Sequence, residues 1–222
     1  VVELLSCPLR ELSLSVLEME HYPALLGFLD FETRRRVAAS LVGIVLEKDL
    51  ALTGVEAVAS LFSFIAPLVR DEEDAPQAPQ EADALAQEQQ LVCRLVHQCR
   101  HEDPDCVFQM LKSMLQAFGQ GGPERLAHTL PPTVCAALGL LPAIRARERR
   151  RAEQEAAQQQ EAQDEAEAPA APQPQPQPQA TAKRVFQFAH RAASELVRVA
   201  PEAALQLWLV AAGAADQQER LA

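Results

Sequence analysis

Cysteine and histidine side chains gather between residues 93 and 106, and these residue types are common zinc ligands. Cys93 and His97 are four positions apart, so on a helix they would share one face and could chelate a metal. The remaining members fall on other helical faces, and neither a C-x-x-C nor an H-E-x-x-H pattern occurs. The full group is Cys93, His97, Cys99, His101 and Cys106. We favour core cysteines and boundary histidines, predict no metal and no cofactor, and keep a metal-dependent protein as an alternative.

Other chemistry-bearing patterns are also incomplete. The glycine-rich run from Gly119 to Gly122 lacks the Lys-Ser/Thr pair and the preceding strand of a phosphate-binding loop. The serines lie in helical patterns and not in the sharp turn that exposes a nucleophile. The sequence therefore predicts a protein that is not an enzyme, and a helix end is the simpler interpretation of the glycines.

Two segments have the composition of helix boundaries. In Glu102-Asp103-Pro104-Asp105, the Asp103 carboxylate can accept from free amides of the next turn, and Pro104 suits the first helical position. In Phe118-Gly119-Gln120-Gly121-Gly122, Gly119 is expected to take the left-handed conformation that ends a helix. A helix from 104 to 118 between them carries a one-sided apolar stripe.

A third boundary is predicted at Thr129-Leu130-Pro131-Pro132. Thr129 would cap a new helix, and Pro131 or Pro132 would open it. The preceding residues, 123–128, would then form only a short helical turn.

The wider pattern predicts an all-α protein. Apolar residues recur at helical spacing in three regions, 1–70, 85–146 and 183–222, and no period-two strand pattern is present. Helices joined by short turns fit an α-solenoid of HEAT-like antiparallel pairs, with a compact bundle as the competing layout. Two low-complexity loops interrupt it: an acidic, Pro-containing loop at 71–84 and a charged, then Pro/Gln-rich insert at 147–182.

Charge narrows the choice of partner. The 222 residues carry a formal net charge of −11. Without the acidic residues of 71–88, a stretch that contains no Lys or Arg, the net charge would be −4. A negative chain argues against nucleic acid or an anionic membrane as main partner. No run of about 18 apolar residues is present, so we expect no direct membrane insertion. Five cysteines, an odd number, indicate reduced thiols in an intracellular compartment.

Two basic runs and one tryptophan have two interpretations each. The runs 34–36 and 149–151 are expected to be solvated helix surface, with a groove for an acidic partner as the alternative. Trp208 is expected to pack between helices, or, if exposed, to anchor an interface.

The three boundary segments, in this order and spacing, resemble the scaffold subunit of retromer, the vacuolar protein sorting 35 family. Two further segments resemble the same family: His21-Tyr22-Pro23-Ala24-Leu25-Leu26 and Phe186-Gln187-Phe188-Ala189-His190. The matches run in family order over most of the chain, as part of the C-terminal half. The Pro/Gln insert departs from the family, where this connection is shorter and richer in Lys.

The resemblance implies a non-catalytic scaffold in endosome-to-Golgi and plasma-membrane retrograde transport, cytoplasmic and peripheral on endosomal membranes. It implies a partner with a phosphoesterase fold, vacuolar protein sorting 29, and an arrestin-like subunit that binds through regions outside this chain. The matching residues are expected to be mainly structural and to set the curvature of the solenoid, so that they position a partner surface whose contact residues are unknown. A helical-repeat adaptor of another trafficking or regulatory complex is the alternative.

Overall fold

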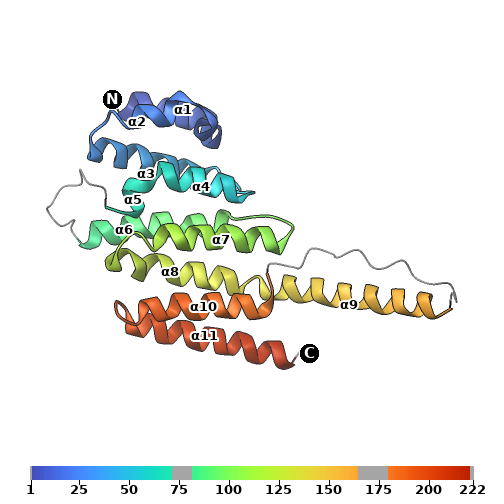
Figure 1. Cartoon of the computed structure of the whole chain (residues 1–222). Helices are drawn as coiled ribbons and strands as arrows, with labels where there is room; N and C mark the ends of the chain where they lie inside the picture. Colours follow the sequence, from blue (N-terminus) through green and yellow to red (C-terminus); the bar gives the residue numbers. More distant parts are fainter. Residues whose placement is uncertain (1, 72–81, 165–179, 221–222) are drawn as a thin grey trace.

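Helices stacked in chain order make up the molecule. The computed structural model describes residues 2–71, 82–164 and 180–220, and within these ranges it contains helices and no strand. Figure 1 shows successive helices layered from the N-terminal end to the C-terminal end, with one helix projecting sideways. The expected all-α solenoid is therefore confirmed.

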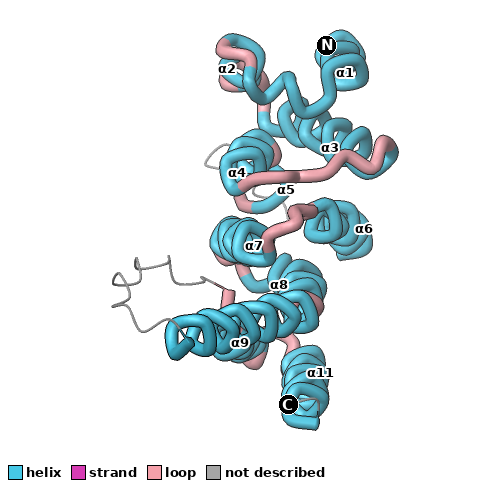
Figure 2. Tube along the Cα trace, turned by 90° about the vertical axis from the view of Figure 1, so that its right-hand side faces the viewer, coloured by secondary structure: helices cyan, strands magenta, loops and turns pink. Residues whose placement is uncertain are grey.

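The first layers comprise residues 2–69. Their α-helices are α1 (Val2–Leu12), α2 (His21–Leu26), α3 (Phe31–Glu47), α4 (Val55–Phe64) and α5 (Ala66–Val69), and a 3₁₀ segment, η1 (Ser13–Glu18), joins α1 to α2. α3 packs on α1 and α5, and α4 packs on η1 and α5. Figure 2 shows α2, α4 and α7 along one side of the stack and α1, α3 and α6 along the other.

The later layers continue this arrangement. Their helices are α6 (Ala82–Cys93), α7 (Pro104–Phe118), α8 (Pro123–Leu138), α9 (Leu141–Asp164), α10 (Ala182–Leu196) and α11 (Pro201–Arg220), with a 3₁₀ segment, η2 (Arg94–Gln98), after α6. α7 packs on α4 and α8, α8 packs on α6 and α10, and α10 packs on α11. One apolar core runs through all of these layers.

Side-chain caps start three of the helices. Asp30 accepts from the Thr33 amide at 3.0 Å before α3, and Thr181 accepts from the Arg184 amide before α10. At α7, Asp103 accepts from the Asp105 amide at 3.0 Å, and Pro104 occupies the first turn. The predicted start of the 104–118 helix is thus confirmed, because a cap satisfies an amide that has no partner within the helix.

The predicted helix boundary at Thr129 is wrong. α8 is one helix that contains both Pro131 and Pro132, and Thr129 caps nothing: its hydroxyl donates to the Arg125 carbonyl one turn earlier. Leu130 and Val134 are fully buried on either side of the prolines. Burial of these side chains and of the rest of this helix face works against the roughly 3 kcal/mol that each interior proline costs.

The left-handed glycine is also not the one that the sequence predicted. Gly119 ends α7 in the right-handed region, with φ −59°, contrary to prediction, and Gly122 takes the left-handed region instead, with φ +79°. Gly121 is required for a different reason. A Cβ built there would lie 2.2 Å from the Val69 carbonyl oxygen at the end of α5, so only glycine allows this approach.

The two low-complexity loops are described only in part. α6 begins at Ala82, inside the predicted acidic loop 71–84, and residues 72–81 of that loop lie outside the described residues. The Arg-rich start of the second insert continues α9, while the Pro/Gln-rich residues 169–179 lie outside them.

Among the described residues, one stretch, Pro123–Gln154, which covers α8 and the start of α9, is long and apolar enough to cross a membrane by length and composition alone. In the described structure, 44% of its apolar window is buried inside the stack. Contacts of α8 with α6, α7 and α10 account for that apolar character, as in a core helix.

Candidate functional site

The side chains of the cysteine and histidine group do not come together in the structure. Among the described residues, no three His, Cys, Asp or Glu side chains come together as metal ligands would. The Cys99 thiol lies 3.7 Å from the Met114 sulfur, while the Cys106 thiol points at the Thr53 carbonyl oxygen, 3.8 Å away. Burial raises the pKa of Cys99 to about 12, so this thiol stays protonated at neutral pH and is a poor nucleophile.

The segments that resemble the family contribute rings to contacts between successive layers. Tyr22 of α2 stacks on Phe64 of α4 with centroids 6.2 Å apart, and its hydroxyl also donates to the Leu5 carbonyl of α1. Phe118, at the end of α7, meets Phe62 of α4 edge-on at 5.2 Å and is almost fully buried.

The same pattern continues toward the C-terminal end. Phe188 of α10 meets Phe108 of α7 edge-on at 5.6 Å. His190, two positions further along, lies 6.3 Å from the ring of Trp208 on α11, which is 36% exposed. Ring contacts from these segments therefore join α2 to α4, α4 to α7, α7 to α10 and α10 to α11. Such contacts resist both sliding and tilting of one layer on the next.

The first turn of α7 is a polar junction. The Asp105 carboxylate accepts from the Arg147 guanidinium of α9 at 2.8 Å and from the Ala180 amide at 2.7 Å, just before α10. Arg147 also donates to the Ala180 carbonyl at 2.5 Å and lies 3.4 Å from Asp103. Asp105 and Arg147 are each 22% exposed. We call Asp105, Arg147 and Ala180 the α9 latch.

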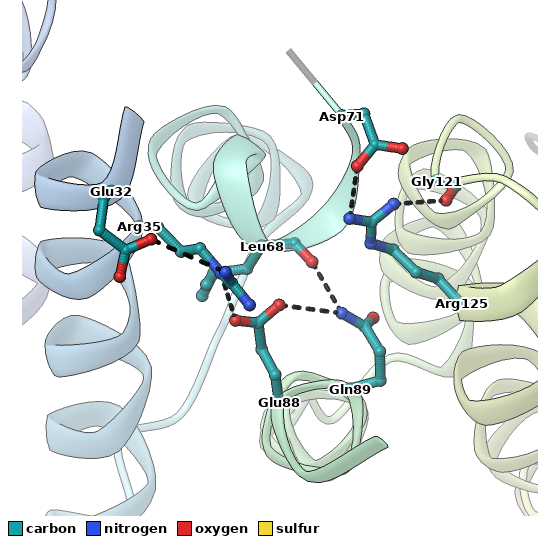
Figure 3. A network of polar contacts seen from close by, with 8 residues as sticks. All are labelled: Glu32, Arg35, Leu68, Asp71, Glu88, Gln89, Gly121 and Arg125. Carbon is teal, nitrogen blue, oxygen red and sulfur yellow. Dashed lines mark hydrogen bonds and ion pairs between the residues drawn. The ribbon is translucent and has the colours of Figure 1, made fainter. Parts of the chain in front are cut away.

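A second set of polar contacts joins α3, α5 and α6, and an ion pair beside it joins α8 to Asp71, just after α5 (Figure 3). Arg35 of α3 donates to Glu88 of α6 at 2.7 Å, and the neighbouring Gln89 donates to the Leu68 carbonyl of α5 at 2.8 Å. Burial raises the pKa of the Glu88 carboxyl by more than the Arg35 guanidinium lowers it. The expectation that 34–36 is only solvated surface is therefore wrong for Arg35, because it is 20% exposed and pairs inside the stack.

Beside these contacts, Arg125 of α8 holds the start of the acidic segment. Its guanidinium donates to the Gly121 carbonyl at 2.9 Å and to Asp71 at 2.6 Å (Figure 3). Arg125 is only 12% exposed, whereas Asp71 is 74% exposed. We call Arg125, Asp71 and Gly121 the acidic-segment root.

A groove crosses the side of the stack that carries α2, α4 and α7. Two adjoining hollows meet at Ala59 and Ser63, so the small side chains of α4 form the floor. Arg34 lines one hollow and Arg70 the other, and among the residues that the structure describes no acidic one lines either. Arg70 donates to Gln120 of α7 at 2.8 Å, which fixes that guanidinium at the rim. A shallow, polar-rimmed surface of this kind suits contact with a protein partner.

Sequence reasoning missed the partners of these polar contacts. Asp105 and Ala180 are 75 positions apart, Arg125 and Asp71 are 54, and Arg35 and Glu88 are 53. No local pattern signals pairs at such separations. The available signal was weak: Glu88 and Gln89 are polar residues within the buried face of a helix, and a buried polar group needs a partner.

Comparison with known proteins agrees with this architecture. The whole chain, residues 1–222, matches the Vps35 family, vacuolar protein sorting-associated protein 35. It is 28% identical over 98% of its length to vacuolar protein sorting-associated protein 35A of Arabidopsis thaliana. It is 31% identical over 62% of its length to vacuolar protein sorting-associated protein 35 of Dictyostelium discoideum. The chain spans 25% of the Arabidopsis relative and 18% of the Dictyostelium relative. The chain belongs to the Vps35 family and corresponds to one part of its members' length.

Proposed function

We propose that this chain is a scaffold segment without catalytic activity in the retromer complex, which returns cargo from endosomes to the Golgi or the plasma membrane. The observation that carries the proposal is the open stack of layers, because a solenoid presents a long surface on which a folded partner can sit. Family membership supports a role in vacuolar protein sorting.

The proposed partner is the retromer subunit with a phosphoesterase fold, vacuolar protein sorting 29. The groove over α2, α4 and α7 is its proposed contact surface, because the groove extends across successive layers and carries arginines at its rim. The arrestin-like subunit would bind regions outside this chain. The protein would act in the cytoplasm, held on endosomal membranes by other components.

The family-like segments would act on this surface indirectly. Tyr22, Phe118 and Phe188 join neighbouring layers, so they set the angle between one layer and the next. The shape of a surface that crosses several layers depends on those angles. Replacing Gly119 and Gly122 with Val should accordingly lower stability and partner binding together, whereas lost binding at an unchanged melting temperature would make the loop a direct contact.

The test is calorimetric titration of this chain with purified vacuolar protein sorting 29, with light scattering to establish stoichiometry. A one-to-one complex is expected. Ala59→Arg places a long side chain on the floor of the groove and should weaken binding at least tenfold. Gln90→Arg is the matched control, because Gln90 is exposed on α6, on the other side of the stack.

Each result has a definite meaning. Equal weakening by both substitutions would place the contact elsewhere. If the folded, helical chain does not bind, the proposed partner surface is wrong for this segment. A longer chain that includes more of the family's length, tested in parallel, would then show whether retromer membership itself fails.

A further inference from the structure

α9 leaves the stack instead of packing along it. Figures 1 and 2 both show it projecting away from the layers formed by its neighbours. Leu141 and Ile144 in its first turn are buried in the core, but after Arg147 none of the α9 side chains that the structure describes is buried. Among the α9 side chains that the structure describes, burial against the body is therefore confined to the base of the helix.

This base has two attachments of different kinds. The first is apolar, where Leu141 and Ile144 join the core beside α10. The second is polar, where Arg147, on the following turn, enters the α9 latch with Asp105 of α7 and Ala180 before α10. Because the two attachments lie on successive turns, together they restrain the direction of the helix axis.

The latch joins three segments through one carboxylate. Asp105 Oδ1 accepts from both Arg147 and the Ala180 amide, and Arg147 also bonds the Ala180 carbonyl. Ala180 is fully buried, and Arg147 Nε is shielded from solvent without a hydrogen-bond partner. The chain leaving on α9 and the chain returning before α10 are thus fastened to the same point of α7.

We propose that the α9 latch is a conformational device that mounts α9 as a rigid arm at a fixed angle to the stack. The latch controls the direction of the arm, while apolar packing between α8, α10 and α11 holds the layers themselves. Of these two attachments, an opened latch leaves the apolar one, which follows the break between α8 and α9 at Gly139 and Leu140. The arm then pivots about that break.

The test measures the arm directly, in the full chain. Keto-bearing unnatural residues at Gln154 on α9 and Gln187 on α10, both exposed, carry nitroxide labels and avoid the native cysteines. Pulsed electron resonance then gives the distribution of distances between the labels. A single narrow distribution is expected for the otherwise unchanged chain, and a distribution at least twice as wide for Arg147→Gln and for Asp105→Asn.

Two matched substitutions serve as controls. Arg150→Gln removes an exposed arginine of the same helix, and Glu102→Gln removes an exposed acid from the same end of α7. Both should leave the distribution narrow, and helicity and melting temperature should be preserved in every variant used. A broad distribution in the unchanged chain, or a narrow one in both folded latch variants, overturns the proposal.

A second measurement needs no substitution. The Ala180 amide donates to Asp105, so in the native chain its hydrogen exchange should be at least about tenfold slower than for an unprotected amide. Exchange at the unprotected rate would show that the latch is open in solution. If Asp105→Ala, which removes the acceptor, is folded, it should accelerate exchange at Ala180 while amides in α3 and α4 keep their rates.

Discussion

The acidic-segment root and the α9 latch fasten two departures from the stack, and they do so differently. At each, an arginine joins a carboxylate and a backbone carbonyl. The carboxylate of Asp71 is 74% exposed at the acidic-segment root, whereas that of Asp105 is 22% exposed in the latch and also accepts a backbone amide.

Backbone packing also distinguishes them. Beside Arg125, Gly121 approaches the Val69 carbonyl so closely that a Cβ would lie 2.2 Å from its oxygen. In the latch, the contacts between α7, α9 and the residue before α10 are made through side chains. The comparison shows that similar ion pairs can differ in structural importance. The Arg125–Asp71 pair lies beside a junction that close backbone packing already fixes, whereas the Arg147–Asp105 pair itself holds its junction together.

The strongest test of this difference is Gly121→Val. No rotamer relieves a clash of Cβ with the Val69 carbonyl, so the end of α5 and the turn between α7 and α8 must separate, at a cost of about 3 kcal/mol or more in the free energy of unfolding. Urea denaturation measures it. Gly43→Ala is the control, since its Cβ would meet no atom within 4 Å and should stabilise the α3 interior by about 0.5–1 kcal/mol. A loss below 1 kcal/mol for Gly121→Val would mean that the backbone does not fix this junction.

The second test concerns the buried pair beside the acidic-segment root. Arg35→Met leaves Glu88 buried with its closest cation removed, which should cost about 2 kcal/mol, less than for a fully buried pair because both side chains keep some exposure. Glu88→Gln, which can still accept a hydrogen bond from Arg35, is the partner variant. The same urea titrations measure this cost. A cost for Arg35→Met within 0.5 kcal/mol of zero would mean that the pair contributes no more to stability than an exposed ion pair does.

The pH dependence of Glu88 follows from its raised pKa. The folded chain holds the proton more tightly than the unfolded chain, whose Glu pKa is about 4.5. As pH rises above that value, the folded state binds more protons than the unfolded state, so the stability contributed by Glu88 falls until its folded pKa is passed. The unchanged chain should therefore lose stability relative to Glu88→Gln as the pH rises from about 4.5 until the folded pKa is passed. Arg35→Met should enlarge this loss, because Arg35 lowers the pKa. A difference that is independent of pH, or of opposite sign, contradicts the raised pKa.

Elements with local signals could be predicted from the sequence. The start of α7 is an example, because Asp103 and Pro104 act on amides within their own turn. α8 shows the limit of such reasoning. Thr129, Pro131 and Pro132 have the composition of a helix start, but burial of Leu130 and Val134 against neighbouring layers decides the conformation. Tertiary packing overrides a local preference there.

The groove and the α9 latch could not be predicted, for a different reason. Each depends on residues that only the stacking brings together, such as Asp105 and Ala180 or Ala59 and Ser113. The glycine run was recognised as a helix end, but the function of each glycine depends on its surroundings. Gly121 is needed because Val69 ends α5 directly opposite it, and nothing near Gly121 in the sequence indicates that.

A smaller effect is expected at the helix cap that precedes the latch. Asp103→Ala removes the acceptor for the Asp105 amide and should lower the free energy of unfolding by about 1 kcal/mol. Asp103→Asn keeps an acceptor oxygen and should recover most of it, since Asn is as good a cap as Asp. Arg147 is only 3.4 Å from Asp103, so the same two variants also test whether that contact matters. Recovery by Asn would assign the effect to the cap, and failure to recover would assign it to the charge.

The smallest effect should come from Asp71→Asn. Although the carboxylate lies 2.6 Å from Arg125, it is 74% exposed, and water replaces its interaction when it is neutralised. We expect a loss of about 0.5 kcal/mol at low salt, falling toward zero at about 1 M salt because exposed charges are screened. Urea titrations of both chains at the two salt concentrations measure this loss. Arg125 would keep its bond to the Gly121 carbonyl, and the Gly121–Val69 approach would be unchanged. A loss above about 1.5 kcal/mol that persists at high salt would contradict the comparison, because it would make the ion pair, and not the backbone, the fixed point of this junction.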